Sequence, residues 1–171
     1  MGVCNALLVA GLTLAAAHAG ADAPSDAQIA HIVVTANQVD IDAGNLARSK
    51  SKSRQVKEFA ERMIGDHKGM NKSALDVAKK LQIKPEPNAT SASFKEYADK
   101  NMKKLKGLSG SGFDKAYIDN EVVYHQNVLD AVDRTLIPGA RNEDLRALLA
   151  SVRPALVAHL DHAKRLQDAT K

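Results

Sequence analysis

Cysteine is almost absent from the sequence: among 171 residues there is one, Cys4. Cys4 precedes an apolar run from Ala6 to Ala17, so it is not placed like the acylated cysteine of a lipoprotein. Removal of this N-terminal segment leaves a chain without any thiol. That excludes disulfide bonds, thiolate metal ligands and thiol catalysis together.

Aromatic residues and strand-forming segments are also scarce. Aromatic residues make up 4% of the chain and tryptophan is absent, whereas 44% of the residues are hydrophobic and 26% are charged. Alanine, leucine, lysine and aspartate dominate, and this mixture favours helices over sheets. The chain is long enough for one domain with its own core. We therefore predict an all-α protein.

No strong charge imbalance is present. The formal net charge is +4, and basic residues are interleaved with acidic ones, which argues against a nucleic-acid partner. The glycines of segment 107–112 are not followed by the Lys-Ser or Lys-Thr of a phosphate-binding loop, and no serine lies in a nucleophile elbow. We expect no organic cofactor and assign no catalytic residue.

The N-terminus lacks the lysine or arginine that normally precedes a secretory apolar run. The run is nevertheless followed by Ala17-His18-Ala19, a small-x-small cleavage site. It is shorter than the roughly 20 apolar residues that span a bilayer. We read residues 1–19 as a signal peptide and 20–24 as a linker. The sequence thus predicts export to the periplasm or cell envelope, with no transmembrane span in the mature chain.

The apolar periodicity of the remaining chain predicts one helical domain over residues 25–171. The expected helices are 26–49, 54–82, 92–105, 113–136 and 143–169. Ser25 and Gln28 are spaced as a capping box, and Pro85 and Pro87 end the second helix. We expect 92–105 to be a shorter crossover helix, capped by Ser91 or Ser93, outside a four-helix bundle. Its lysine-rich end is either a solvated surface or a peripheral contact with the envelope.

Two further features concern helix geometry. Residues 137–140 are expected to form a turn, and Pro154 should kink the last helix. Gly65 and Gly69, which bracket His67, are expected to let a neighbouring helix approach closely.

Each of the four long helices carries one polar residue where its apolar stripe requires a hydrophobic one. These residues are Asp40, His67, His125 and His159. All lie near the middle of their helices, so antiparallel packing would bring them into one layer inside the bundle.

Three imidazoles and one carboxylate form a donor set for a single divalent metal ion. We favour zinc, with iron, manganese or copper as alternatives. Asn71, Glu121 and Tyr117 (or Tyr124) are spaced to orient the ligands. The sequence contains no Glu-x-x-His, which argues against a di-iron centre. His31 and His162 lie off the stripe and are expected at the surface, and His18 belongs to the leader.

Three motifs follow one another in order: Met63-x-x-Asp66-His67, then Gly110-x-Gly112-Phe113-Asp114-x-Ala116-Tyr117 before His125, and Pro154-x-Leu156-x-x-His159-Leu160-x-x-Ala163. In these motifs the chain resembles the family known as domain of unknown function 4142, exported bacterial proteins often described as membrane or outer-membrane proteins. The resemblance covers about Asp26 to Ala169. It implies a ferritin-like four-helix bundle with interior histidines, and no particular reaction. Where such proteins usually carry Glu in the first helix, this chain has the shorter Asp40.

The leading hypothesis is an exported metal-binding protein with a role in the envelope or in stress. The alternative is an envelope interaction or structural module whose buried histidines form only a hydrogen-bonded core. A small redox enzyme with an open metal position is a third reading. The sequence does not indicate an oligomeric state.

Overall fold

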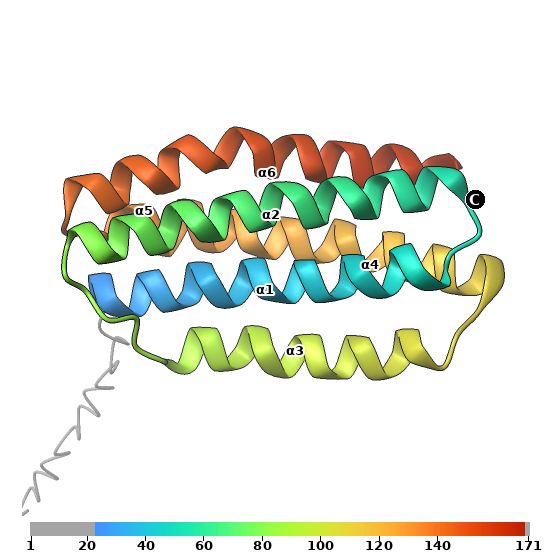
Figure 1. Ribbon diagram of the computed structural model, residues 1–171, viewed down its shortest axis with the longest axis horizontal. Helices are drawn as coiled ribbons and strands as arrows, with labels where there is room; N and C mark the ends of the chain where they lie inside the picture. The colour runs from blue at the N-terminus through green and yellow to red at the C-terminus, as the bar shows by residue number, and fades with distance from the viewer. Residues whose placement is uncertain (1–22, 170–171) are drawn as a thin grey trace, which may run out of the picture.

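The computed structural model describes residues 23–169, and this part of the chain is entirely helical (Figure 1). The expected signal peptide and residues 20–22 of the expected linker lie outside the described range. The elements are α1 (Asp26–Lys50), α2 (Arg54–Lys80), α3 (Ala89–Lys106), α4 (Gly110–Ala131), a π-helical turn η1 (Val132–Leu136), α5 (Ile137–Gly139) and α6 (Glu143–Ala169).

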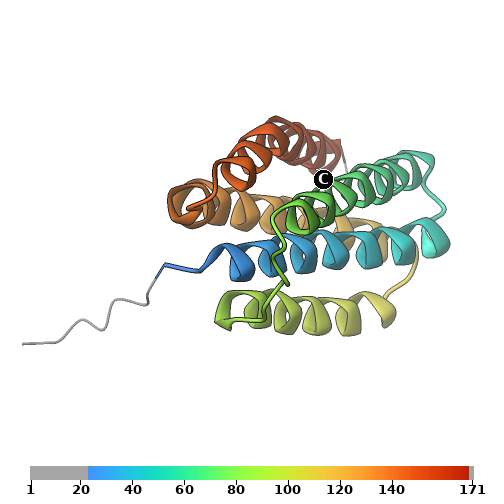
Figure 2. The same cartoon turned by 60° about the vertical axis from the view of Figure 1, so that its left-hand side comes forward.

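The four longest helices lie side by side, and α3 covers them from outside (Figures 1 and 2). Helix α1 contacts α2 and α4, and α6 contacts the same two helices from the opposite side. Each of these neighbours runs antiparallel to the next (Figure 1). Helices α2 and α4 run in the same direction because α3 first carries the chain back along their length. This arrangement brings the middles of α1, α2, α4 and α6 together.

Local sequence fixes how the first two helices begin. The Ser25 hydroxyl accepts the Gln28 backbone N–H at 3.2 Å, and the Gln28 side chain accepts the Ser25 N–H at 3.0 Å. This is the capping box that the sequence predicts. The Ser53 hydroxyl accepts the Val56 N–H at 3.4 Å and caps α2 in the same way. Only residues 51–53 separate the two helices, so α1 and α2 form a tight antiparallel pair.

Helix α3 begins earlier than expected, because its cap is Asn88 rather than Ser91 or Ser93. The Asn88 side chain accepts the Ser91 N–H at 2.9 Å, and the Ser91 hydroxyl accepts the Asn88 N–H at 3.0 Å. A reciprocal pair of this kind satisfies two donors that would otherwise lack partners at the helix start. The helix therefore gains its first turn from Ala89 onward.

The expected turn at residues 137–140 is instead largely helical. Helix α4 widens into η1, where the Ile137 N–H reaches back to the Val132 carbonyl. Pro138, which has no backbone N–H to donate, follows directly on this widened turn. The chain leaves the helix only at Ala140, whose N–H donates to the Leu136 carbonyl at 2.9 Å. Pro154 lies inside the continuous span of α6.

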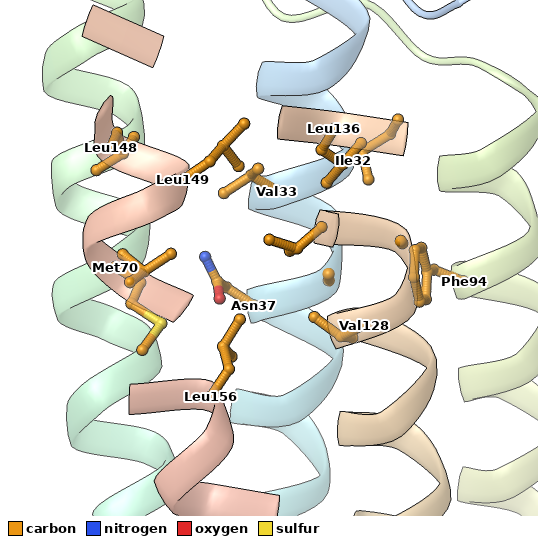
Figure 3. Close-up of a pocket in the computed structure, with 14 residues that line it drawn as sticks. Ile32, Val33, Asn37, Met70, Phe94, Val128, Leu136, Leu148, Leu149 and Leu156 are labelled. Carbon is orange, nitrogen blue, oxygen red and sulfur yellow. The ribbon is translucent and has the colours of Figure 1, made fainter. Parts of the chain in front are cut away.

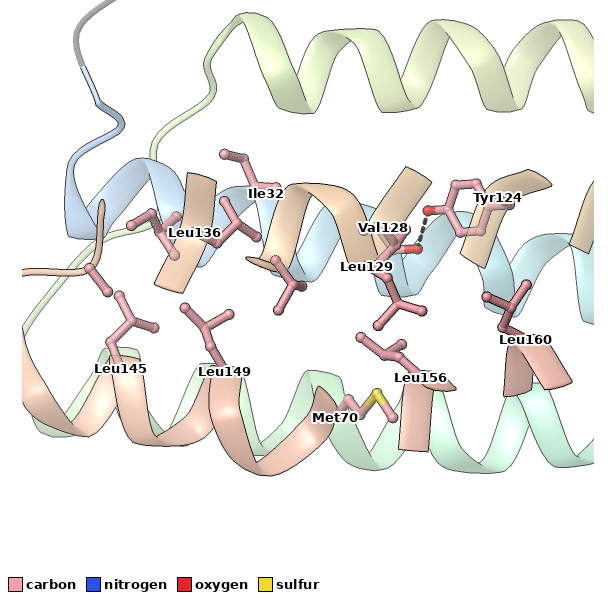
Figure 4. Close-up of a cluster of buried hydrophobic side chains, with 14 residues drawn as sticks. Ile32, Met70, Tyr124, Val128, Leu129, Leu136, Leu145, Leu149, Leu156 and Leu160 are labelled. Carbon is pink, nitrogen blue, oxygen red and sulfur yellow. Dashed lines mark hydrogen bonds between the residues drawn. The ribbon is translucent and has the colours of Figure 1, made fainter. Parts of the chain in front are cut away.

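The hydrophobic core consists of two clusters at opposite ends of the helices. The first gathers leucines and valines of α4, η1 and α6 around Ile29 and Ile32 of α1 (Figure 4). The second is built on Phe59, Phe113 and Tyr117, with small alanines of α1 and α6. Between the clusters lies a layer of buried polar side chains.

Helices α1 and α2 approach each other tightly at Gly44, and not at Gly65 or Gly69. A Cβ atom on Gly44 would lie 3.0 Å from the Ile64 Cγ1 and 3.2 Å from the Ala60 carbonyl oxygen. A Cβ atom on Gly65 or Gly69 would meet nothing within 4 Å. The expectation for these two glycines was wrong, because both lie on the exposed face of α2.

Within residues 23–169, none of the helices combines the length and the apolar character needed to cross a bilayer.

Candidate metal centre

The structure brings together the four polar residues that the sequence singles out. Asp40, His67, His125 and His159 come from α1, α2, α4 and α6, and each is at most 2% exposed. The centroids of the three imidazole rings are 5.2 to 5.6 Å apart. One donor atom from each histidine lies within 4.8 Å of those of the other two. The four residues thus form one compact layer between the two apolar clusters.

His67 is held by a residue of the neighbouring helix. Its Nδ1 donates to the Asn37 Oδ1 at 2.8 Å, and Asn37 lies one turn before Asp40 on α1. Because Nδ1 carries a proton in this hydrogen bond, Nε2 is the nitrogen through which the ring can bind an ion. Nε2 lies 2.8 Å from the Asp40 Oδ2, within ion-pair distance, and neither atom has a regular hydrogen-bond partner among the described residues. Two electron donors therefore face the same region.

His125 follows the same pattern within its own helix. Its Nδ1 donates to the Glu121 carbonyl oxygen at 3.0 Å, which leaves the Nε2 lone pair free. That Nε2 lies 3.3 Å from the Asp40 Oδ2 and has no hydrogen-bond partner in the described part of the chain. Burial lowers the pKa of His125 more strongly than the nearby Asp40 raises it. The ring is therefore neutral at pH 7.

His159 is held from outside by a carboxylate of α2. Its Nε2 donates to the Asp66 Oδ2 at 2.8 Å, and its Nδ1 has no partner within residues 23–169. Burial lowers the pKa of His159 to about 4, even though the hydrogen bond to Asp66 opposes this shift. The Asp66 side chain is 42% exposed and also pairs with Arg62 at 3.3 Å. Asp66 thus links the buried layer to the molecular surface.

The two buried carboxyl groups have opposite protonation preferences. Burial alone would raise the pKa of Asp40, but His67 and His125 outweigh it when their rings carry a proton, and they hold that pKa well below the usual range. Burial and the Asp40 charge raise the pKa of Glu121 far above its ordinary value. Asp40 therefore favours the ionised form and Glu121 the protonated form.

Glu121 lies inside the layer, closer to its centre than the supporting position that its sequence spacing suggests. Its side chain is fully buried, and its Oε2 lies 3.6 Å from the His125 Nδ1 without a hydrogen bond. One donor atom each from Asp40, Glu121 and His125 lies within 4.8 Å of the others. Glu121 can therefore supply a further oxygen ligand to the same centre.

The other residues that the sequence suggests as supports differ in their hydrogen bonding. The Tyr117 hydroxyl is buried without a partner among the described residues, and burial together with the nearby carboxyl groups of Glu121 and Asp40 raises its pKa. The Tyr124 hydroxyl instead donates to the Ala36 carbonyl at 2.8 Å (Figure 4). The Asn71 Oδ1 has no hydrogen-bond partner within the described range. Asn37 takes the supporting position beside His67 that we expected for Asn71.

His31 and His162 lie outside the layer, but neither is on the open surface. Both are half-buried. The His31 Nδ1 lies 3.3 Å from the Thr35 hydroxyl, and the His162 ring packs edge-on against Phe59 with centroids 5.1 Å apart. Both residues lie off the layer, as expected, and each is partly rather than fully exposed.

The arrangement can accommodate one cation. Each of the three histidines has one nitrogen bonded to an acceptor and one lone pair free, which is how proteins orient imidazole ligands. His125 belongs to both groups of donors, yet it has a single free nitrogen. The two groups must therefore share one ion.

The fold and the buried layer define an all-helical protein with an interior cluster of histidines and carboxylates. Its sequence matches the family described as "Domain of unknown function (DUF4142)" over residues 11–166. The chain belongs to this family, which confirms the resemblance inferred from the motifs. No curated protein matches the sequence.

The structure is similar to the crystal structure of a DUF305 protein from Streptomyces coelicolor that is described as secreted. The TM-score is 0.70 at 12% sequence identity, and the similarity covers 85% of this chain and 93% of that chain. At this level of identity the similarity shows a shared fold and nothing more.

Proposed function

We propose that this protein binds one divalent metal ion through His67, His125, His159 and Asp40. The observation that supports this most directly is the state of the donor atoms. The Nε2 atoms of His67 and His125, the Nδ1 of His159 and both Asp40 oxygens are buried and have no hydrogen-bond partner among the described residues. A cation at the centre of the layer satisfies all of them at once.

The energetic argument points the same way. Each buried polar group without a partner costs about 1–3 kcal/mol, and the total stability of a domain is only about 5–15 kcal/mol. A layer with several such groups would take up much of that stability if nothing neutralised it. Binding a cation converts the same groups from a cost into a source of stability.

Zinc suits the donor set best. Zinc takes neutral imidazole nitrogens and carboxylate oxygens at about 2.0–2.2 Å. The observed separations require the rings to close slightly on the ion. Iron, manganese and copper accept similar ligands. Ionised Asp40 supplies one negative charge, and Glu121 adds a second if the ion displaces its proton.

We further propose that the fold is a ferritin-like four-helix bundle with α3 as the crossover helix. The antiparallel contacts among α1, α2, α4 and α6 support this, since such bundles build metal sites from facing helices. Export is supported by the apolar leader of the sequence and by the secreted description of the similar Streptomyces protein. An ion-binding role in the envelope or in stress follows, with no reaction assigned.

The test is a direct measurement of metal content and affinity. Purified protein is stripped with a chelator, titrated with Zn²⁺ by calorimetry, and its metal content is measured by elemental analysis. We expect one Zn²⁺ per chain in the wild type and in His31→Ala, whose ring lies outside the layer. His67→Ala should lose most of the affinity.

A purely structural layer predicts a different result. His125→Leu would then stabilise the fold without changing any metal-dependent property, because replacing a buried polar group by a well-packed apolar one is often stabilising. That outcome, together with no metal in the native protein, would exclude the metal-binding proposal in favour of a structural module.

A further inference from the structure

A largely enclosed cavity lies next to the polar layer, within the first apolar cluster (Figure 3). It offers about 30 Å³ to the centre of a water-sized sphere. The space is therefore large enough for at least one water-sized molecule.

On each of the four long helices, a residue about one turn away from the layer lines the cavity. Asn37 lies three residues before Asp40, and Met70 lies three residues after His67. Val128 lies three residues after His125, and Leu156 lies three residues before His159. All four of these residues line the cavity. Only one turn of helix therefore separates an occupant from the proposed metal ligands.

Two irregular stretches of backbone border the same cavity. Val132 and Leu136, the ends of the π-helical turn η1, line one side. Val152 and Leu156, which flank Pro154 in α6, line another. A π-helical turn and an internal proline both disturb regular side-chain packing along a helix, which accounts for a gap at this level. π-Helical turns are also frequent at functional sites.

The lining is apolar except for one amide. Asn37 is buried, with 6% of its surface exposed. Its Oδ1 accepts from His67, and its Nδ2 has no partner within residues 23–169. In Figure 3 this amide lies among Val33, Leu149 and Met70. The cavity therefore combines hydrophobic walls with a single hydrogen-bond donor.

This chemistry disfavours water as the occupant. A buried water molecule needs two to four polar partners, and apolar cavities without them stay dry. A small, weakly polar molecule loses little by leaving water and gains contacts with the walls.

We propose that this cavity is a binding site for one small gas molecule of the dioxygen class, with Asn37 Nδ2 facing one end of it. The proposal goes beyond metal binding, because the cavity is formed by apolar side chains and does not require an ion. The Asn37 amide would then contact the gas molecule with its nitrogen and the His67 ring with its oxygen. Asn37 would then be the one residue that lies between the bound gas and His67 of the layer.

The test uses methyl NMR of the full mature chain, metal-free and zinc-loaded, under xenon pressure and then under dioxygen against argon. Xenon should cause saturable shifts in the methyl groups of Val128, Leu149 and Leu156. Dioxygen should relax the same methyl groups more strongly than those of Leu105 and Ile118 in the other cluster.

Two variants fill the cavity, and one serves as the control. Ala36→Val and Val132→Ile add methyl groups to its wall and should weaken xenon binding about tenfold or more. Val123→Ile adds the same group on the exposed face of α4 and should leave binding unchanged. If Ala36→Val does not fold, Val132→Ile carries the comparison. Absence of xenon shifts in the wild type, equal shifts in the filled variants, or equal relaxation of both clusters by dioxygen would each overturn the proposal.

Discussion

Each histidine of the layer uses one nitrogen to hold its orientation and presents the other to the centre. The acceptors are three different groups: the amide of Asn37, the backbone carbonyl of Glu121 and the carboxylate of Asp66. Because the acceptor decides which nitrogen carries the proton, it also decides which nitrogen can bind an ion. Substitution of the residues that orient the rings should therefore weaken metal binding, as substitution of the ligands does.

Asn37→Leu removes the acceptor of His67 while keeping a similar side-chain volume. Loss of such an orienting partner typically lowers metal affinity about 10–100-fold, and we expect a loss of this size for Zn²⁺. Calorimetric titration of the chelator-treated variant measures it. Asn127→Leu, an exposed position on α4, is the matched control and should bind as the wild type does. Equal affinities for the two variants would contradict this role of Asn37.

The pKa of His159 makes a separate prediction for the metal-free protein. Burial lowers it from 6.5 to about 4, so between these pH values the unfolded chain binds a proton that the folded chain does not. The contribution of His159 to the free energy of unfolding is therefore complete above pH 6.5 and falls as the pH drops towards 4.

Histidine NMR titration should show the His159 ring remaining neutral until the pH approaches 4. The free energy of unfolding of the wild type should also fall more steeply below pH 6.5 than that of His159→Asn. A His159 ring that titrates near its ordinary pKa would show that the layer is open to water.

The sequence could indicate the members of the layer but not the contacts that orient them. A polar residue within an apolar stripe is visible in the heptad pattern, and this is how Asp40, His67, His125 and His159 were found. Asn37 and Asp66 occupy ordinary polar positions. Their role depends on which neighbouring helix each ring turns towards, and a single helix pattern does not contain that information.

At the scale of helices, the contact between α1 and α2 depends on one glycine. Gly44→Ala would place a Cβ atom 3.0 Å from the Ile64 Cγ1 and 3.2 Å from the Ala60 carbonyl oxygen. The helices would have to separate, and overpacking of this kind costs about 1–3 kcal/mol. Urea unfolding of the metal-free protein measures the loss.

Gly65→Ala is the natural comparison, because its added methyl group meets nothing within 4 Å. Alanine stabilises a helix interior relative to glycine by roughly 0.5–1 kcal/mol. The two Gly→Ala substitutions should therefore change stability in opposite directions. A gain of stability in both variants would show that the contact at Gly44 is looser than described.

The sequence predicts where the helices lie better than where they end. The apolar periodicity located all the long helices, because the residues of a buried helix face recur every three or four positions. The π-helical turn η1 was not foreseen. Ile137, Pro138 and Gly139 normally indicate a turn, whereas in the structure the preceding Val132 and Leu136 pack into the first cluster and the helix continues to Gly139.

For the whole molecule, metal binding and folding should be linked. An ion bound only by the folded state adds about 2.7 kcal/mol at a free concentration one hundred times its Kd. For a domain of this size that corresponds to an increase in Tm of roughly 5–10 °C. Differential scanning calorimetry with and without Zn²⁺ measures the shift. His67→Ala should abolish it and His31→Ala should retain it, and an identical shift in both variants would point to binding elsewhere on the chain.

The complete burial of the layer also has a consequence for how long an ion stays. His125 and His159 are at most 1% exposed, so an ion between them cannot leave through the static structure. Release requires a local opening, and the partly exposed Asp66, which joins His159 of α6 to α2, marks one edge where it can occur. The residence time of the ion is then set by how often α6 lifts from α2, and local openings of this kind can be far rarer than ligand exchange at a surface site. An ion held in this way would be protected from stronger chelators by slow kinetics.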